Sequence, residues 1–249
     1  MAVLVTRPLP DGETTAADLR ARGFEVVAAP MLRFEPFGFS EEEAETPYGG
    51  IIVTSANAVR AVESRLANSP LLKLPLFTAG ERTAAVARAA GFGNVLSADG
   101  DAVALRDLVV ETAKAKKLKK QSPLLYLAGE EISRDLAGEL REQGFEVVTH
   151  IAYRMVPAKN LPSEVVDGFA AGRIEAVLHY SRRSARAFVE AARTGGVEIS
   201  ALALPQCCIS AQVAEIVREA GAAQVTVAAR PDENALFEAL KRALPARLA

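Results

Sequence analysis

A long internal repeat constrains the fold of this chain more than any other feature. Residues 19–27 (LRARGFEVV) are matched by residues 140–148 (LREQGFEVV), which lie 121 positions further on. A repeat that spans about half the chain predicts two copies of one α/β unit. Two such units predict a cleft between them, and we expect the functional site in that cleft.

The repeat extends to whole strand–helix–strand segments. In each copy an apolar run comes first, at 3–5 and at 124–127, and a helix follows that ends at the shared glycine. Glycine is favoured there because it adopts a left-handed helix cap at little cost. Two later pairs match in the same order, 51–61 with 176–187 and 76–96 with 208–227. Small insertions between the pairs are typical of a duplication followed by loop changes.

Composition agrees with two α/β units. The chain has 249 residues, of which 50% are hydrophobic, and this is enough for two ordinary cores. Short apolar strands alternate with helices of about a dozen residues, a pattern typical of parallel sheets covered by helices. The sequence therefore predicts an α/β protein with parallel sheets.

Membrane segments and structural cysteine chemistry are not indicated. No apolar run approaches the roughly 20 residues that span a bilayer, and the first residues enter a strand without the regions of a signal peptide. We therefore expect a cytoplasmic protein.

Cys207 and Cys208 are adjacent on a predicted buried strand, which suits neither an ordinary disulfide nor a metal site, and we predict core cysteines.

Several common catalytic motifs are missing from the sequence. There is no phosphate loop ending in Gly-Lys-Ser/Thr, no Gly-x-Gly-x-x-Gly after a strand and no Gly-x-Ser-x-Gly turn. Their absence argues against nucleotide cofactors and covalent serine catalysis. The two histidines, His150 and His179, lie on or beside predicted strands without metal-type partners, so we predict structural histidines and no metal site.

Hydroxyl, amide and arginine side chains gather in the turns that follow the predicted strands. Ligands of open parallel sheets bind at the carboxyl ends of the strands, and helix starts there favour carboxylates or phosphates. Each serine or threonine has the alternative role of a helix N-cap. Six such turns together favour a site for a polyanion, and they are 6–8, 54–57, 80–83, 129–131, 181–184 and 210–212.

The ordered series of segments resembles the uroporphyrinogen-III synthase family. The resemblance rests on VTRP at 5–8, TSANAV at 54–59, TAGERTA at 78–84, LYLAG at 125–129, EVVTHIAYR at 146–154 and PDENAL at 231–236. It covers nearly the whole chain in the right order. It implies two similar flavodoxin-like parallel-sheet domains, joined by a two-stranded linker, with the active-site cleft between them.

The resemblance also implies a reaction. Such enzymes cyclise hydroxymethylbilane, a linear tetrapyrrole rich in carboxylates, to uroporphyrinogen III with loss of water and inversion of ring D through a spiro intermediate. They use no cofactor and no metal, and the pyrrole nitrogens supply much of the driving force. The protein's main task would be to hold a flexible polyanion in the reactive shape.

The partners implied by the resemblance follow from that reaction. They are the small-molecule substrate hydroxymethylbilane and a transient hand-over from hydroxymethylbilane synthase. We expect no nucleic-acid partner, no membrane partner and a monomeric enzyme.

Tyr153 matches the family tyrosine that is proposed to help the hydroxyl leave, and it is the predicted catalytic residue. Its alternative role is that of a packed tyrosine at a strand end. The predicted substrate-binding residues are Arg7, Ser55, Asn57, Arg82, Thr83, Ser181, Arg182, Ser210 and Gln212. Arginine suits carboxylates because it binds them with two hydrogen bonds. Because the net charge is −2, attraction of an acidic substrate must come from local donors.

One turn departs from the family pattern. Where many relatives carry a threonine, residues 210–214 are SAQVA. A threonine contact with the substrate is therefore in doubt here. Ser210 and Gln212, or their backbone amides, would have to replace it.

The resemblance implies interlaced domains, whereas duplication alone would place a break near 122–123. Residues 1–34 and 157–249 would form domain 1, and residues 37–152 would form an inserted domain 2. The linkers would lie at about 33–37 and 153–157. Each reaches a proline, Pro36 or Pro157, which favours extended backbone before it. We expect these linkers to act as a hinge.

Two functions from other classes fit the same layout. A two-domain binding protein would clamp an anionic small molecule without chemistry, although the absence of a signal peptide counts against it. A regulatory or fused synthase-like module with a decayed site is the second alternative, for which the changed turn at 210–214 is the one indication.

Overall fold

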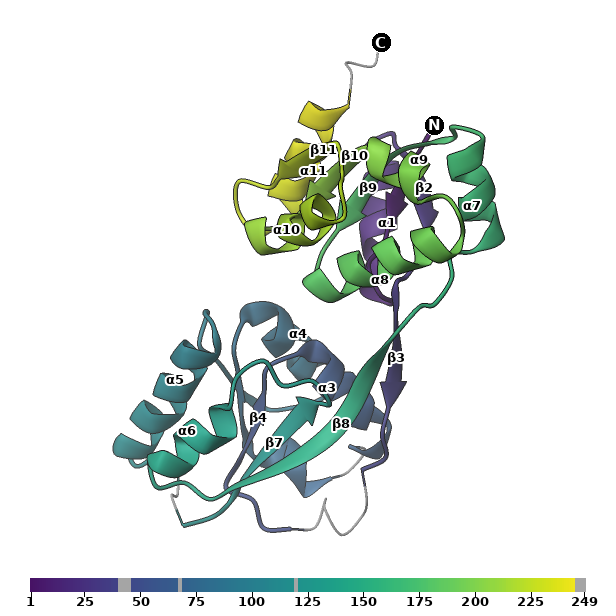
Figure 1. The fold of residues 1–249 in the computed structure, drawn as a ribbon. Helices are drawn as coiled ribbons and strands as arrows, with labels where there is room; N and C mark the ends of the chain where they lie inside the picture. The colour runs from purple at the N-terminus through teal and green to yellow at the C-terminus, as the bar shows by residue number, and fades with distance from the viewer. Residues whose placement is uncertain (40–45, 67–68, 119–120, 245–249) are drawn as a thin grey trace. The chain divides into compact units, whose positions relative to one another are not determined.

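The structure is a computed structural model that describes residues 1–39, 46–66, 69–118 and 121–244. The chain divides into two compact units (Figure 1). Unit 1 consists of Met1–Arg33 and Val156–Ala249, and unit 2 of Phe34–Met155. The chain thus enters and leaves unit 2 once, so unit 2 is continuous in sequence and unit 1 is not.

Unit 1 is built on a five-stranded parallel sheet. Its strands are β1 (Ala2–Val5), β2 (Glu25–Ala28), β9 (Ile174–His179), β10 (Pro205–Cys208) and β11 (Gln224–Val227). They pair in the order β11-β10-β9-β1-β2. Counted along the chain within the unit, this is the flavodoxin-like order, which confirms the predicted fold class.

Helices cover both faces of this sheet. They are α1 (Asp11–Ala21), α7 (Ser163–Ala170), α8 (Arg182–Thr194), α9 (Glu198–Ala203), α10 (Ala211–Glu219) and α11 (Glu233–Ala243). Since side chains alternate along a strand, Val3 and Val5 pack in the core beneath α1 and α11, whereas Leu4 packs in the core beneath α7, α8 and α10. The sheet is therefore buried on both faces, as its nearly uninterrupted apolar strands predict.

The two cysteines of β10 follow the same alternation. Cys207 belongs to the core on one face of the sheet and Cys208 to the core on the other, and both are free thiols. Burial raises the pKa of each thiol to about 12. The prediction of core cysteines is confirmed, since both side chains are buried.

Unit 2 has a sheet of the same design with one added edge strand. Its strands are β3 (Leu32–Pro36), β4 (Gly50–Val53), β5 (Pro75–Thr78), β6 (Asn94–Ser97), β7 (Leu124–Gly129) and β8 (Val147–Pro157). They lie in the order β3-β8-β7-β4-β5-β6, and the pairs from β8 to β6 are parallel. Its two cores follow the alternation of β4, where Ile51 and Val53 face one core and Ile52 the other.

Among the described residues of unit 2, four α-helices and two 3-10 turns cover this second sheet. They are α3 (Ala56–Val62), α4 (Glu81–Ala89), α5 (Ala102–Lys114), α6 (Leu136–Glu142), η1 (Glu63–Arg65) and η2 (Pro70–Lys73). Helices α3 and α4 lie over the core that contains Ile51, and α5 and α6 lie over the core that contains Ile52.

The repeat corresponds to equivalent positions in the two sheets. The segment β1-α1-β2 matches β7-α6-β8, while β9 and β10 match β4 and β5. The helices α1 and α6 are both followed by a glycine with positive φ, +85° at Gly23 and +82° at Gly144, as the repeat predicts. The spatial order of matching strands is the same, but the chain visits them in a permuted sequence.

The two predicted linker segments are neighbouring strands. β3 ends at Pro36 and β8 ends at Pro157, and the two strands are adjacent in the sheet. The Phe37 N–H donates to the Ala152 carbonyl at 2.7 Å, and Arg154 Nε lies 2.7 Å from Glu35 Oε2. β8 is longer than a linker requires, because it already begins at Val147 as the second strand of the repeat.

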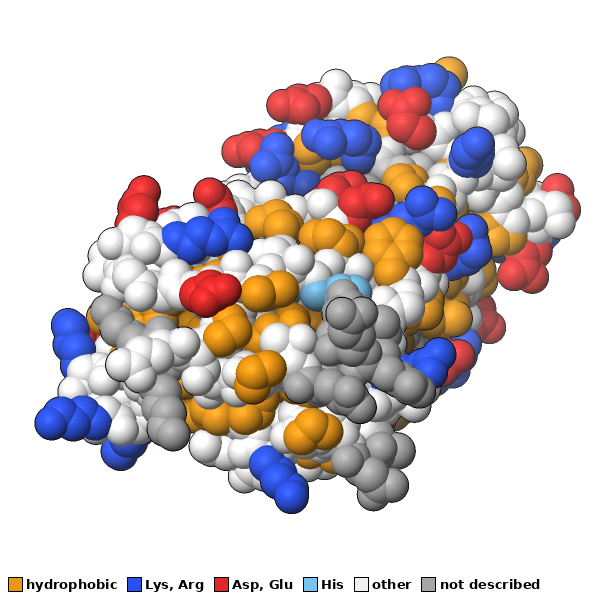
Figure 2. All heavy atoms as spheres, turned by 90° about the horizontal axis from the view of Figure 1, so that it is seen from below, with side chains coloured by type: hydrophobic (Ala, Val, Ile, Leu, Met, Phe, Trp, Pro, Cys, Tyr) orange, Lys and Arg blue, Asp and Glu red, His pale blue; other side chains and the backbone are white. Residues whose placement is uncertain are grey.

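The surface carries charges of both signs. On the face drawn in Figure 2, acidic and basic side chains are intermixed. This agrees with the net charge of −2 and leaves the attraction of an anion to local groups. Within the described ranges, no helix has the length and apolar character needed to cross a membrane.

Candidate functional site

A pocket of about 220 Å³ lies in unit 2 at the carboxyl ends of the central strands. Thr54 follows β4, Ala79 follows β5 and Gly129 ends β7, and all three line it. The other lining residues are Ala102, Tyr126, Glu131, Ile132, Ser133, Arg134, Leu136 and Tyr153. This is the edge at which parallel sheets bind ligands. The pocket brings Tyr153, the predicted catalytic residue, together with residues of two predicted turns, 54–57 and 129–131.

A β-bulge in β8 sets the direction of the Tyr153 side chain. Ala128 pairs with Ile151 and Gly129 with Tyr153, so Ala152 is an extra residue in the ladder. Consecutive residues of a regular strand point to opposite faces, yet Ala152 and Tyr153 both pack against the core beneath α3 and α4. The bulge therefore keeps Tyr153 on the α3/α4 face of the sheet, from which it lines the pocket at the strand end.

The Tyr153 ring lies directly against Gly129. A Cβ atom added to Gly129 would be 2.8 Å from Tyr153 Cζ and 2.9 Å from its hydroxyl oxygen. Phe34 also contacts the ring, with centroids 5.6 Å apart and an interplanar angle of 38°. Glycine is required at 129 because any side chain would occupy the place of the tyrosine.

Two further hydroxyls lie in the pocket. Thr54 Oγ1 and the Tyr126 hydroxyl oxygen are 3.4 Å apart. Burial raises the pKa of Tyr126; the hydrogen bond with Thr54 opposes this shift and the nearby Tyr153 adds to it. The phenol of Tyr126 is therefore kept protonated and available to donate a hydrogen bond.

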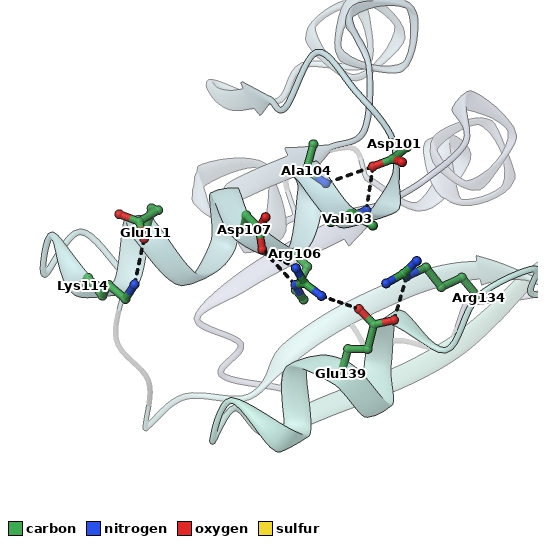
Figure 3. A network of polar contacts seen from close by, with 9 residues as sticks. All are labelled: Asp101, Val103, Ala104, Arg106, Asp107, Glu111, Lys114, Arg134 and Glu139. Carbon is green, nitrogen blue, oxygen red and sulfur yellow. Dashed lines mark hydrogen bonds and ion pairs between the residues drawn. The ribbon is translucent and has the colours of Figure 1, made fainter.

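Arg134, at the pocket, belongs to an ion-pair network between α5 and α6 (Figure 3). Its Nε lies 2.6 Å from Glu139 Oε1, while Glu139 Oε2 lies 3.1 Å from Arg106 Nη1. Arg106 Nη2 also lies 2.7 Å from Asp107 Oδ1. The hydrogen bond from Arg134 and then the charge of both arginines lower the pKa of Glu139, which keeps it ionised.

The other predicted residues of unit 2 lie outside the lining of this pocket. Ser55 Oγ accepts from the Asn57 N–H at 3.3 Å and is the N-cap of α3, its alternative role. The Asn57 side chain accepts from Arg60 at 2.9 Å and donates to Met155 Sδ at 3.6 Å. Arg82 and Thr83 lie in the first turn of α4, where Arg82 is exposed and Thr83 is buried.

Apart from Arg7, the predicted residues of unit 1 lie at the starts of α8 and α10. Ser181 Oγ accepts from the Ser184 N–H at 3.1 Å and caps α8, with exposed Arg182 next to it. Ser210 is the N-cap residue of α10 but makes no side-chain capping bond, and Gln212 is exposed in the first turn.

Helices α4 and α10 occupy the same place in the two repeats and begin in the same way. Their N-cap residues are Gly80 and Ser210, and neither supplies a side-chain hydrogen bond to the helix. The first N–H groups of each helix therefore lack an acceptor from the cap residue, and the positive end of the helix dipole lies there. Both helix starts are suited to a carboxylate.

Arg7 differs from the expectation that it meets a ligand directly. Its Nη1 lies 2.8 Å from Glu233 Oε1 and 2.9 Å from Thr15 Oγ1, and its guanidinium lies 4.4 Å from the centroid of the Tyr180 ring. The Tyr180 hydroxyl donates to the same Glu233 oxygen at 3.0 Å. Burial, followed by the Glu233 charge, raises the pKa of Tyr180. Arg7 therefore belongs to an internal ion pair within unit 1.

Sequence reasoning missed three pocket residues, namely Thr54, Tyr126 and Arg134. Thr54 lies in the predicted turn 54–57, in which Ser55 and Asn57 are the predicted binding residues. Tyr126 and Arg134 lie on a strand and in a loop whose path depends on the neighbouring strand β8. The signal that could have identified Thr54 and Arg134 is that they follow β4 and β7, two neighbouring strands of the sheet.

Comparison with known proteins gives consistent matches. Residues 13–238 match the family model described as "Uroporphyrinogen-III synthase HemD". The chain resembles the crystal structure of uroporphyrinogen-III synthetase from Helicobacter pylori 26695, with 18% identity, a TM-score of 0.65, and coverage of 97% of this chain and 98% of that one.

A second solved structure is a mutant uroporphyrinogen III synthase from the extremely thermophilic bacterium Thermus thermophilus. It is 17% identical with a TM-score of 0.57, and the match covers 98% of each chain. At these identities the structural matches show the fold. Among curated proteins, none is similar enough to count as a match.

Proposed function

The chain belongs to the uroporphyrinogen-III synthase family, and we propose that it converts hydroxymethylbilane to uroporphyrinogen III at the pocket beside Tyr153. It is an enzyme of tetrapyrrole biosynthesis, a cyclising lyase. The observation that carries the placement of the reaction is that Tyr153 lines a pocket that also holds Thr54 and Tyr126.

In the proposed reaction, Tyr153 donates a hydrogen bond to the terminal hydroxyl of the bilane. The carbon–oxygen bond breaks as the pyrrole nitrogen supplies electrons, and the hydroxide leaves as water with the proton that this nitrogen gives up. The exocyclic carbon of the resulting azafulvene is attacked by a substituted carbon of ring D. This bond gives the spiro intermediate, which fragments and closes again with ring D inverted. Tyr126 and Thr54 provide further hydroxyl donors at this place.

We assign the binding of substrate carboxylates to the starts of α4 and α10. The first N–H groups of both helices lack a capping side chain, and Ser210 is free of a capping bond. The neighbouring candidates are Arg82, Thr83, Arg182 and Gln212. Ser55, Asn57 and Ser181 would bind the substrate from turns that they already stabilise. A substrate carboxylate would bind Arg7 only if it replaced Glu233.

The paired strands β3 and β8 are proposed to form the hinge between two domains, with domain 1 at 1–34 and 157–249 and domain 2 at 37–152. The chain passes between its two compact units within these strands. X-ray scattering with and without substrate analogue should show a change in the radius of gyration. One fixed shape would refute the hinge.

We further propose a monomeric cytoplasmic enzyme that takes hydroxymethylbilane from hydroxymethylbilane synthase. Two buried, unpaired thiols suit a reducing compartment. Light scattering of the purified protein tests the monomer, and a dimer at micromolar concentration would contradict it.

The decisive experiment supplies enzymatically generated hydroxymethylbilane and separates the product isomers by chromatography. We expect uroporphyrinogen III as the main product. Uroporphyrinogen I alone, at the rate of spontaneous closure, would refute the synthase function and favour a binding protein or a module with a decayed site.

Gly129→Ala is expected to lower kcat about tenfold without unfolding the protein. The added methyl would lie 2.8 Å from Tyr153 Cζ, so the ring must leave its position. Steady-state kinetics and a thermal melt measure the two effects. Gly93→Ala is the matched control, because nothing lies within 4 Å of its added Cβ. Equal activity of the two variants would show that the position of Tyr153 does not matter.

A further inference from the structure

We propose that Arg134 binds a carboxylate of the substrate ring that reacts at Tyr153, and that Glu139 and Arg106 position it for this task. The assignment rests on the proposed function and extends it by naming a binding residue. Among the described residues that line the pocket, Arg134 is the single basic one. The group that it would recognise is the acetate or propionate carboxylate of one pyrrole.

The ion-pair network orients the Arg134 side chain but leaves it partly exposed. Glu139 divides its oxygens between two arginines, with Oε1 2.6 Å from Arg134 Nε and Oε2 3.1 Å from Arg106 Nη1. The Arg134 side chain is 42% exposed although its Nε lies close to Glu139, so a carboxylate can approach its guanidinium from the pocket. A guanidinium fixed in this way loses little conformational freedom when it binds a carboxylate.

The loop that carries Arg134 is fixed at both ends. At its start, the Glu130 N–H donates to the Tyr153 carbonyl at 2.8 Å. At its end, Asp135 Oδ1 accepts from the Gly138 N–H at 2.8 Å and caps α6. These bonds tie the position of Arg134 to the strand of Tyr153, which lines the same pocket.

The size and walls of the pocket fit one pyrrole ring. Its volume of about 220 Å³ is below the roughly 300–1,000 Å³ of pockets that enclose drug-sized ligands. Ala79, Ala102 and Leu136 supply apolar walls for the ring. The one acidic lining residue in the described structure is Glu131, whose charge would repel an acid-bearing ring. Arg134 offsets that charge and supplies the donors.

The test compares the steady-state kinetics of R134Q, R134K, E139Q and R193Q with those of the wild type. We expect R134Q to raise KM for hydroxymethylbilane about 10- to 100-fold, the usual effect of losing a charged hydrogen bond. The value of kcat should stay within about threefold, because Tyr153 is untouched. The KM of R134K should lie between those of the wild type and R134Q, because lysine keeps the positive charge but cannot form two parallel hydrogen bonds with a carboxylate.

Two variants separate binding from structure. E139Q keeps Arg134 but removes the anion that orients it, so KM should rise by less than in R134Q. R193Q is the matched control, because Arg193 is an ion-paired arginine of unit 1 on α8, outside the pocket, and KM should not change. Thermal melts of all variants show whether folding is retained.

Substrate analogues make the assignment specific. Two analogues of the bilane carry methyl in place of the acetate or in place of the propionate of the terminal ring. With the analogue that lacks the carboxylate bound by Arg134, the KM of R134Q should be within about twofold of the wild-type KM. An equal penalty with both analogues, or a KM of R134Q within twofold of the wild type, would overturn the assignment.

The two levels fail separately. If the wild type forms no isomer III, the proposed function is refuted. If the wild type forms isomer III and R134Q has an unchanged KM, the function stands and only the role of Arg134 is refuted.

Discussion

Tyr153→Phe is expected to lower kcat for uroporphyrinogen III formation about 100-fold and to leave KM within about threefold. The substitution removes only the hydroxyl, so the ring keeps its contacts with Gly129 and Phe34. Activity should not vanish, because the pyrrole nitrogens still expel the leaving group. The share of isomer I should rise as spontaneous closure competes.

Chromatography of the isomers over a time course measures this effect. Tyr48→Phe is the control, because Tyr48 is a buried tyrosine of unit 2 that does not line the pocket. Tyr126→Phe should have a smaller effect than Tyr153→Phe, since the Tyr126 hydroxyl is shared with Thr54. A rate for Tyr153→Phe equal to that of Tyr48→Phe would remove Tyr153 from the mechanism.

Acid is expected to destabilise unit 1 through His179. This side chain is fully buried, its Nε2 lies 2.9 Å from Gln206 Oε1, and its Nδ1 has no partner in the described structure. The Gln206 amide donates to the carbonyls of Ala201 and Leu204 at 2.8 and 2.9 Å, so its oxygen must face the histidine. Burial lowers the pKa of His179 to about 4, against the opposing hydrogen bond with Gln206.

The sign of the pH effect follows from this shift. The unfolded chain takes up a proton at the ordinary histidine pKa of about 6.5, whereas the folded protein does so only near pH 4. Between these values the unfolded state binds more protons, so stability falls as the pH falls. The free energy of unfolding should drop by about 3 kcal/mol between pH 7 and pH 4 from this group alone.

His179→Gln should remove this contribution and flatten the dependence. Urea unfolding followed by circular dichroism at several pH values gives the free energy, and hydrogen exchange assigns it to unit 1. His150→Gln is the control, because the chain has two histidines and His150 lies in unit 2. A loss of stability in His179→Gln as steep as in His150→Gln would show that His179 is not the acid-sensitive group.

The regular parts of the fold were predictable because they depend on local patterns. The repeated helix before Gly23 and Gly144, the buried strands and the N-cap positions of Ser55 and Ser181 all follow from neighbouring residues. The family resemblance supplied the flavodoxin-like order of the sheets, which local patterns alone leave open.

The site depends on contacts between distant residues, and for that reason the sequence revealed it only in part. Arg7 pairs with Glu233, which lies 226 positions away, so no local pattern shows that Arg7 has an internal partner. The bulge at Ala152 decides where Tyr153 points, and nothing in residues 146–154 marks one extra residue in the ladder. Arg134 pairs with Glu139 of α6, and Arg106 of α5 reaches the same carboxylate from 33 positions away.

The permuted order of the strands determines when each unit can fold during synthesis. β1 lies between β2 and β9 in the sheet, and residues 34–155 separate β2 from β9 along the chain. At typical rates of about 5–20 residues per second, the first strands wait roughly ten to thirty seconds for their partner. Unit 2 is continuous in sequence and is complete by then, so we expect it to fold before unit 1, whose strand β1 still lacks β9.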